Sequence, residues 1–247
     1  MEDGPDREGP AAGAAGGPPD ARDPRDPDEP ADVRQRRERL VERDVAPVVD
    51  APRVLDALRR VPRHRFVPGP HRSRAYEDRP FPIGEGQVIT QPSLVARMAA
   101  AARIRPGDRV LEVGTGSGYG AAVLAELAAR VRTLERRERF VETARRRLAA
   151  LGYENVEVVR ADGSRGDPEG APWDAAVCTA GAPEVPEPLL EGLRPGGWLV
   201  IPLGGRPREQ TLFRVRRSRE GVRKRESLGP VRFVPLVGEA GWPAESV

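Results

Sequence analysis

Three glycines at alternate positions, Gly114, Gly116 and Gly118, follow a short apolar run that is typical of a buried strand. An Ala/Leu-rich stretch with a helical pattern, residues 121–129, comes directly after them. Glycine suits such a turn because it takes positive φ angles and leaves no Cβ in the way of a ligand. The free N–H groups at the start of the next helix then face that ligand. The pattern predicts a site for a nucleotide-like cofactor.

The spacing of these glycines and a nearby acid distinguish between two kinds of cofactor. The dinucleotide fingerprint G-x-G-x-x-G, counted from Gly114, requires glycine where this chain has Tyr119. A shifted frame that starts at Gly116 and ends at Ala121 matches loosely, so a nicotinamide cofactor stays open. Glu112 lies two residues before the first glycine and places a carboxylate under the loop. A carboxylate there favours a cationic ligand over a pyrophosphate.

Two further acids stand at the ends of the next predicted strands. Glu135 ends the run 131–135, 21 residues after the first glycine, where a carboxylate can accept hydrogen bonds from both ribose hydroxyls. Asp162 follows the run 156–159, where a carboxylate can accept from an adenine amino group. Each acid alone is equally compatible with a helix cap or a solvated loop. Together with a cation over Glu112 and no pyrophosphate, they describe S-adenosylmethionine.

The ordered motifs of the chain resemble those of the protein-L-isoaspartate O-methyltransferase family, over roughly residues 33–237. The glycine loop alone is typical of any class I methyltransferase, whereas the first and last motifs are far more specific to this family. The motifs are PFPIGEGQVITQP at 80–92, EVGTGSGY at 112–119, RADG at 160–163, PGGWLVIPLG at 195–204 and VRFVPL at 231–236.

The resemblance implies an activity, a cofactor and a set of site residues. The activity is methyl transfer from S-adenosylmethionine to the carboxylate of L-isoaspartyl residues in damaged proteins or peptides, which initiates repair through a succinimide. Thr90 is implied at the acceptor carboxylate, where the family usually has serine, and its extra methyl group stiffens χ1. The residues implied around the cofactor are Gln91, Pro92, Ser93, Glu112, Gly114, Thr115, Gly116, Ser117, Gly118, Glu135, Asp162 and Gly163.

The scarcity of bases near these motifs agrees with a carboxylate acceptor. The two histidines, His64 and His71, lie in another segment, and the single cysteine, Cys178, lies in an apolar strand-like run without metal-ligand spacing. We therefore expect no metal site. An aspartyl-type acid has a pKa of about 4, so no base has to remove a proton at pH 7. Catalysis then depends on holding the carboxylate in line with the methyl group and removing its water, with Thr90 orienting it by a hydrogen bond.

Alternating strand and helix patterns predict the framework that positions these residues. Such alternation is typical of a doubly wound α/β fold with a mostly parallel sheet and ligands at the carboxyl ends of its strands. The runs 212–215 and 231–234 are expected to form a closing hairpin. The resemblance implies a Rossmann-like sheet of seven strands, one of them antiparallel. Strands are expected at 109–113, 131–135, 155–160, 173–178 and 197–203, and helices at 117–130, 137–151 and 185–193.

The N-terminal part divides into a tail, two helical patterns and a loop. Residues 1–31 are almost wholly Gly, Pro, Ala, Asp and Arg, which predicts a disordered tail. Helical patterns at 33–45 and 52–60 form, by the resemblance, a cap over the site, and the Pro- and Gly-rich run 76–90 predicts a loop without helix or strand. The domain boundaries expected are 1–31 for the tail, 32–240 for the methyltransferase domain (cap and acceptor loop 32–92, core 93–240) and 241–247 for a C-terminal tail.

Composition argues against several other classes of protein. The formal charge of +3 is carried almost entirely by arginines interleaved with acids, so we expect no nucleic-acid partner. Residues 179–183, after the fourth predicted strand, lack the Asn/Asp-Pro-Pro-aromatic motif of enzymes that methylate nucleobase amines. The sequence contains neither a run of about 18 apolar residues nor a secretory signal. We expect a soluble, cytoplasmic monomer that binds no membrane.

Two alternative functions stay open at this point. A tailoring enzyme of the same family would methylate an aspartate in one dedicated peptide, although the chain ends soon after the run 231–236 without an added recognition domain, which favours repair. A NAD-binding oxidoreductase would use the shifted glycine frame. Binding of S-adenosylhomocysteine without binding of NAD would exclude the oxidoreductase.

Overall fold

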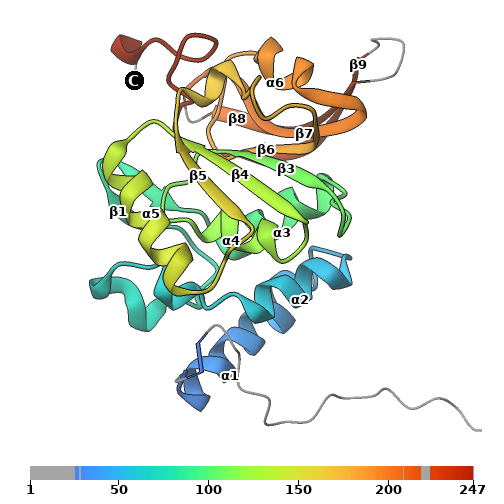
Figure 1. Ribbon diagram of the computed structural model, residues 1–247. Coiled ribbons are helices and arrows are strands. Elements are labelled where there is room, and N and C mark those ends of the chain that lie inside the picture. Colours follow the sequence, from blue (N-terminus) through green and yellow to red (C-terminus); the bar gives the residue numbers. More distant parts are fainter. Residues whose placement is uncertain (1–25, 28, 208, 218–222, 247) are drawn as a thin grey trace, which may run out of the picture.

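A seven-stranded sheet with the order β5-β4-β3-β6-β7-β8-β9 forms the centre of the computed structural model, which describes residues 26, 27, 29–207, 209–217 and 223–246 (Figure 1). Five strands run parallel, and β8 runs antiparallel to both of its neighbours. This confirms the mostly parallel Rossmann-like sheet with one reversed strand. The strands are β3 (Arg109–Val113), β4 (Arg130–Glu135), β5 (Val156–Arg160), β6 (Trp173–Cys178), β7 (Leu193–Arg206), β8 (Glu209–Arg217) and β9 (Arg223–Val231).

The central strands are apolar on both faces because helices or other segments cover both sides of the sheet. Successive residues of β3 point to opposite faces, so Val110 belongs to the apolar cluster on one side and Leu111 to the cluster on the other. Cys178 at the end of β6 is fully buried, as expected. The helices α3 (Pro92–Ala101), α4 (Tyr119–Ala125) and α5 (Glu138–Ala150) lie on one side, and α6 (Glu187–Glu191) lies on the other (Figure 1).

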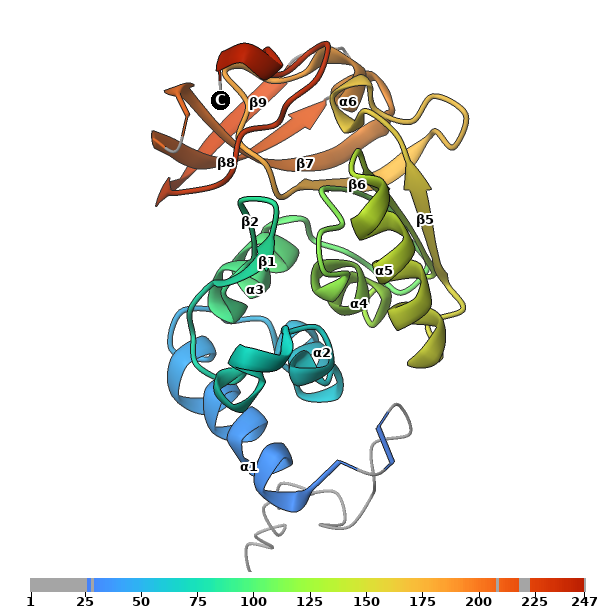
Figure 2. The same ribbon diagram turned by 90° about the vertical axis from the view of Figure 1, so that its left-hand side faces the viewer.

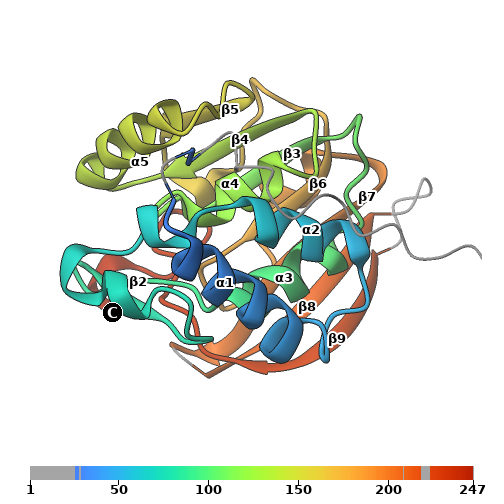
Figure 3. The ribbon, with the colours of Figure 1, turned by 90° about the horizontal axis from the view of Figure 1, so that it is seen from below.

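The helical cap packs beneath α3 and α4, on the side of the sheet away from α6 (Figure 2). It comprises α1 (Ala31–Leu40), a π-helical turn η1 (Val41–Val45) and α2 (Pro52–Arg60), so both predicted helical patterns are confirmed. Seen from below, α1 and α2 lie in front of α3 (Figure 3). The short 3₁₀ turns η2 (Arg63–Arg65) and η3 (Gly69–Arg74) lead from the cap to the site. None of the helices in the described part of the chain has the length and apolar character needed to cross a membrane.

The boundary of the predicted tail is wrong at its C-terminal end. Residues 1–25 and 28 lie outside the described residues, but the carboxylate of Asp26 lies 3.0 Å from His64 Nε2, and Glu29 forms a 2.7 Å ion pair with Arg37. All four side chains are nearly buried. His64 and Arg37 are largely shielded from water, so each is stabilised by an acidic partner, and this keeps Asp26 and Glu29 in place. The composition of residues 26–31 gives no sign of these pairs.

The run 76–90 was wrongly expected to lack strands. It contains an antiparallel hairpin of β1 (Phe81–Gly84) and β2 (Gln87–Ile89), in which Phe81 pairs with Ile89 and both are buried. Strands of four and three residues, interrupted by Pro and Gly, are too short to show a reliable alternation of apolar and polar residues. The packing of their two apolar ends against the core stabilises the hairpin.

The expected closing hairpin is right in kind but misplaced at one strand. Residues 212–215 lie in β8, whereas its partner β9 is Arg223–Val231 and not 231–234. After Val231 the chain leaves the sheet, and Val234 O accepts a 2.8 Å hydrogen bond from Gly181 N.

Trp242 lies in the segment that was expected to form the C-terminal tail. Its indole donates a 3.0 Å hydrogen bond to the Gly181 carbonyl, so this residue is bound to the core.

Candidate functional site

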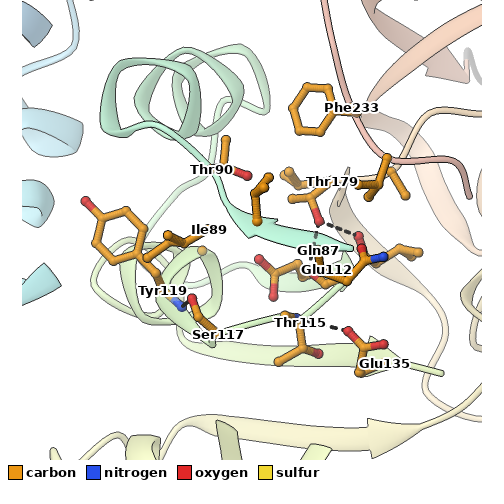
Figure 4. Close-up of a pocket in the computed structure, with 18 of the residues that line it drawn as sticks. Gln87, Ile89, Thr90, Glu112, Thr115, Ser117, Tyr119, Glu135, Thr179 and Phe233 are labelled. Atoms are coloured by element: carbon orange, nitrogen blue, oxygen red, sulfur yellow. Dashed lines mark hydrogen bonds between the residues drawn. The ribbon is translucent and has the colours of Figure 1, made fainter. Parts of the chain in front are cut away.

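A pocket of about 520 Å³ lies at the carboxyl ends of β3, β4 and β6, against the β1–β2 hairpin (Figure 4). This volume lies within the usual range for a small-molecule site. The order of the strands reverses direction at β3, because the next strands in the chain, β4 and β5, lie on one side of it and the later strand β6 lies on the other. Ligands of doubly wound folds bind at such a switch point. The lining comes from the hairpin with Thr90 and Gln91, the loops after β3, β4, β5 and β6, and residues 232–237.

The glycine loop after β3 has the backbone geometry that the sequence predicts. Gly114, Gly116 and Gly118 have φ angles of 97°, 50° and 89°, which favour glycine. A Cβ on Gly114 would lie 2.3 Å from Thr179 Oγ1, so this glycine also allows close packing against the end of β6. The helix expected from residue 117 begins at Tyr119. Gly114, Thr115, Gly116 and Ser117 line the pocket, whereas Gly118 does not.

Glu112 is the buried carboxylate under this loop, and two threonines form a hydrogen-bonded chain with it. Thr133 Oγ1 donates to Glu112 Oε2 at 2.5 Å, and the Thr115 and Thr133 hydroxyls lie 2.6 Å apart. Glu112 Oε1 would lie 2.3 Å from a Cβ on Gly120, so only glycine leaves room for the acid there. Burial raises the pKa of Glu112 to about 8, although the Thr133 hydrogen bond opposes this rise. The pocket therefore holds a carboxylate that a cationic ligand would help to ionise.

Glu135 connects the end of β4 to the glycine loop. Its Oε2 accepts a 3.0 Å hydrogen bond from Gly116 N, and its Oε1 accepts a 2.9 Å bond from Arg137 N. The residue is 8% exposed and lines the pocket, and its contact with a ribose stays a prediction. The hydrogen bonds fix the orientation of the carboxylate.

Asp162 and Gly163 follow β5, but only Gly163 lines the pocket. Asp162 Oδ1 accepts from Ser164 N and Oγ, and Oδ2 accepts from Glu239 N at 2.9 Å. Burial alone would raise the pKa of Asp162, but these hydrogen bonds outweigh it and lower the pKa. A Cβ on Gly163 would lie 2.4 Å from Val113 Cγ1, so the loop approaches β3 closely. The predicted bond from Asp162 to adenine stays a prediction.

Thr90 follows β2 directly and lines the pocket near Phe233, at the end away from Thr115 and Glu135 (Figure 4). Its carbonyl accepts a 3.2 Å hydrogen bond from the buried guanidinium of Arg63. Burial lowers the pKa of Arg63, while nearby Tyr119 and Asp78 oppose this shift. Arg63, in the turn η2 that follows the cap, thus holds the backbone of Thr90, and Thr90 lines the pocket.

The start of α3 is capped by an acid from the loop before the hairpin. Asp78 accepts from Ser93 N at 2.8 Å and from Ser93 Oγ at 2.6 Å, and Gln91 Nε2 donates to Ser93 Oγ at 3.0 Å. Gln91 lines the pocket, whereas Pro92 and Ser93 do not. The structure gives Ser93 a capping partner, and a cofactor contact of Pro92 or Ser93 stays a prediction.

Several residues that line the pocket or support its lining were missed from the sequence. Thr133 does not line the pocket but donates to Glu112, and it gave no chemical signal because a threonine in a strand is usually explained by β propensity. Thr179, Arg137 and Glu85 lie in loops or turns whose contacts depend on segments far apart in the chain. Phe233 lies in the last motif that the resemblance quoted, so the motif located it without giving it a role. In the described part of the chain no group of three or more His, Cys, Asp or Glu could hold a metal ion.

Comparison with known proteins gives consistent relatives. The model of the family "Protein-L-isoaspartate(D-aspartate) O-methyltransferase (PCMT)" matches residues 35–241. "Protein-L-isoaspartate O-methyltransferase 2" of Pelobacter propionicus is 52% identical over 208 residues, covering 84% of this chain and 92% of that protein. "Protein-L-isoaspartate O-methyltransferase" of Methanoculleus marisnigri is 50% identical over 213 residues, covering 86% of this chain and 96% of that protein.

Solved structures show the same likeness. A protein-L-isoaspartate O-methyltransferase superposes with a TM-score of 0.72 at 29% identity, over 84% of this chain and 67% of that one. A putative protein-L-isoaspartate O-methyltransferase from Plasmodium falciparum, in complex with S-adenosyl-L-homocysteine, superposes with a TM-score of 0.69 at 24% identity, over 80% of this chain and 96% of that one. The second comparison shows the shared fold.

Proposed function

This chain belongs to the protein-L-isoaspartate(D-aspartate) O-methyltransferase family, and we propose that its methyl transfer takes place in the pocket beneath the β1–β2 hairpin. The enzyme transfers a methyl group from S-adenosylmethionine to the carboxylate of L-isoaspartyl residues in damaged proteins and peptides. The relatives do not favour a dedicated aspartate-tailoring enzyme or a NAD-dependent oxidoreductase. The monomeric state, the cytoplasmic location and the absence of a nucleic-acid partner stay predictions.

The donor groups of the pocket fit S-adenosylmethionine. Glu112 is buried with its pKa raised to about 8, and no cation is found paired with it among the described residues. A positively charged ligand would restore the charge of this acid and so gain affinity. Gly114 and Gly163 line the pocket with backbone alone, and each lets its loop pack closely against a neighbouring side chain. When bound, the cofactor supplies an electrophilic methyl group on a positive sulfur.

We assign three acids and the glycine loop to the cofactor. Glu112 faces its cationic part, Glu135 accepts from the ribose hydroxyls, and Asp162 with Gly163 lies beside the adenine. The supporting observation for Glu135 is its place in the lining with a carboxylate oriented by two backbone N–H groups. For Asp162 the support is its position after β5, next to the lining residue Gly163.

Thr90 orients the acceptor carboxylate. Its hydroxyl would donate a hydrogen bond to one carboxylate oxygen while the other oxygen attacks the methyl group. No base takes part, because the isoaspartyl carboxylate is already ionised at pH 7. Phe233 near Thr90 is apolar, as are Val95 and Met98 elsewhere in the lining, and an apolar lining removes water from the nucleophile. Positioning and desolvation then lower the barrier.

Repair follows from the ester that the enzyme makes. The next backbone nitrogen attacks the ester carbonyl, and methanol leaves as the succinimide ring closes. Water then opens the ring at either carbonyl, so some molecules return to normal aspartate. The ester forms the succinimide faster than the free acid does, because methanol is a far better leaving group than the oxide ion that an ionised carboxylate would have to expel.

The observation that carries this proposal is the position of Thr90, directly after the hairpin and in the lining of a pocket that also contains Glu112. The experiment is labelled methyl transfer from S-adenosylmethionine to two matched peptides, one with L-isoaspartate and one with L-aspartate. We expect strong preference for isoaspartate. Preference for aspartate would favour a tailoring enzyme instead.

The role of Thr90 is tested with two substitutions. Thr90→Val removes the hydroxyl at similar volume and should lower kcat/KM about 100-fold, the usual order for loss of one positioned donor. Thr90→Ser keeps the hydroxyl and should retain activity within a few fold. Both should bind S-adenosylhomocysteine as the parent enzyme does. Unchanged turnover in Thr90→Val would remove Thr90 from the mechanism.

A further inference from the structure

The turn of the β1–β2 hairpin contains a residue in an unfavourable backbone conformation. Gly84, Glu85 and Gly86 have φ angles of 103°, 50° and 71° in succession. The flanking glycines take these angles easily, but a residue with a Cβ is disfavoured at positive φ. Glycine or asparagine at position 85 would fit the turn with less strain. Non-glycine residues in such conformations often mark a functional side chain, so the contacts of Glu85 are informative.

The Glu85 side chain joins the hairpin to the loop after β4 and to the first turn of α5. Glu85 Oε2 accepts a 2.8 Å hydrogen bond from Arg137 Nη1, and Glu85 Oε1 lies 4.0 Å from Arg139 Nη1. Glu85 and Arg137 both line the pocket, and their side chains are 32% and 38% exposed. The ion pair therefore connects two walls of the pocket while remaining accessible to water.

The hairpin has a second contact with the opposite wall. Ile83 Cδ1 lies 3.4 Å from the position of a Cβ on Gly116, so this side chain rests on the glycine loop. Arg137 N also binds the Glu135 carboxylate, whose other oxygen binds Gly116 N. The hairpin is thus seated on the same loop and the same acid that hold the cofactor in the proposed site. Its other end continues directly into Thr90.

We propose that Glu85 and Arg137 are positioning residues that fasten the β1–β2 hairpin across the cofactor pocket, so that they set how long S-adenosylhomocysteine stays bound and where Thr90 stands. This inference rests on the proposed function of the pocket. Neither residue touches the reacting atoms. A partly exposed ion pair is weak enough to open in each catalytic cycle and strong enough to slow release by about two- to fivefold.

The first experiment measures the dissociation rate of S-adenosylhomocysteine from the full-length enzyme by stopped flow. Glu85→Gln keeps the shape of the side chain and removes the charge, and it should speed release about two- to fivefold. The matched control is Glu157→Gln, which breaks the exposed 2.8 Å Arg130–Glu157 pair between the far ends of β4 and β5. The control should leave the dissociation rate unchanged. Equal rates in all three proteins would overturn the proposal.

Charge reversal separates the ion pair from general damage to the turn. Glu85→Arg places three like charges together, and Arg137→Glu repels Glu85, so each should speed release more than Glu85→Gln does. The double variant should recover most of the parent rate. Higher ionic strength should speed release from the parent enzyme but hardly from Glu85→Gln, because salt screens exposed charges. A double variant as fast as the single ones would contradict the pairing.

Glu85→Gly separates retention of the cofactor product from stability. Glycine relieves the backbone strain, so the variant should keep or raise its melting temperature while releasing S-adenosylhomocysteine faster and showing a higher KM for S-adenosylmethionine. A purely structural role for Glu85 predicts that stability and retention fall together. If the parent enzyme bound no S-adenosylhomocysteine at all, the proposed function would fail; normal binding with unchanged release in these variants would overturn this inference alone.

Discussion

The floor and the roof of the pocket hold charge in opposite ways. The floor, formed by Glu112 and the glycine loop 114–117, keeps its carboxylate almost fully buried and bonded to the Thr133 hydroxyl behind it. The roof, the hairpin 81–89, keeps its carboxylate Glu85 in an ion pair that water reaches. A buried group is held by fixed neighbours and resists change, whereas an exposed ion pair is screened and reversible.

This difference matches what the two regions have to do. In the proposed site the floor presents the same surface to each cofactor molecule, so a dry and preorganised network is useful there. In the same proposal the roof lets one molecule leave and another enter, which requires an ion pair of modest strength. The contrast predicts that changes in the floor have large effects on affinity and stability, and that changes in the roof have small, salt-dependent ones.

The largest effect on binding is expected from one of two glycine substitutions. Gly114→Ala in the floor combines φ of 97° with a Cβ 2.3 Å from Thr179 Oγ1, so the loop must shift and binding of S-adenosylhomocysteine should fall at least about 100-fold. Gly86→Ala in the roof has φ of 71° but no atom within 4 Å of the new Cβ, so only strain of about 1 kcal/mol is expected. Calorimetric titration of both variants checks this. Equal losses of affinity would break the distinction between floor and roof.

The second prediction concerns the pH dependence of stability. Folding raises the pKa of Glu112 to about 8 from an ordinary value near 4.5, so the native state keeps a proton that the unfolded chain has lost. Stability from this group is therefore full below pH 4.5 and is lost as the pH rises toward 8, by about 5 kcal/mol in total. Glu112→Gln does not titrate and should lack this fall. Urea unfolding at pH 5.5, 7 and 8.5 measures it.

The same titration should appear in cofactor binding. If ionised Glu112 attracts a cation, the affinity for S-adenosylmethionine should rise by up to about tenfold per pH unit between pH 6 and 8. The affinity of Glu112→Gln should be lower and should lack this part of the rise. Parallel pH profiles for the two proteins, in stability and in affinity, would contradict a buried titrating carboxylate in the floor.

The sequence predicted the floor much better than the roof, and the reason is physical. Glu112 and Glu135 lie at the ends of the apolar strands β3 and β4, and the glycine loop follows β3, so their positions at one edge of the sheet follow from parallel topology. The hairpin lacks such a signal, because its strands are three and four residues long and are stabilised by packing of Phe81 and Ile89 against distant segments. Its ion pair joins residues 52 positions apart.

Contacts between distant segments also explain the other misplaced boundaries. Asp26 and Glu29 resemble the tail before them in composition, and only the buried partners His64 and Arg37 distinguish them. β9 is rich in charged residues because it is an edge strand, so its pattern did not mark it as part of the sheet. Local patterns predict elements that have one apolar face. The boundaries of polar segments such as residues 26–29 and β9 depend on their partners elsewhere in the fold.

The third prediction concerns the hydroxyl that supports the floor. Thr133→Val removes the donor to Glu112 and leaves the shape nearly unchanged, so it should lower the free energy of unfolding by about 1–3 kcal/mol where Glu112 is ionised. Because this hydrogen bond lowers the pKa of Glu112, its loss should raise that pKa further, so the fall in stability should continue to a higher pH. Thr133→Ser keeps the donor and serves as the control. A fall that ends at the same pH in both variants would show that the hydroxyl does not act on Glu112.

The smallest effect is expected for the stability of the roof. Glu85→Gln removes an exposed ion pair and should change the free energy of unfolding by less than about 1 kcal/mol. In about 1 M salt the Debye length is only about 3 Å, so the difference between the two proteins should nearly disappear. The pH-dependent fall caused by Glu112 should persist at that salt concentration, because solvent ions cannot reach a buried carboxylate. Thermal unfolding at low and high salt compares them directly: if both effects vanished together, the floor would be as open to solvent as the roof.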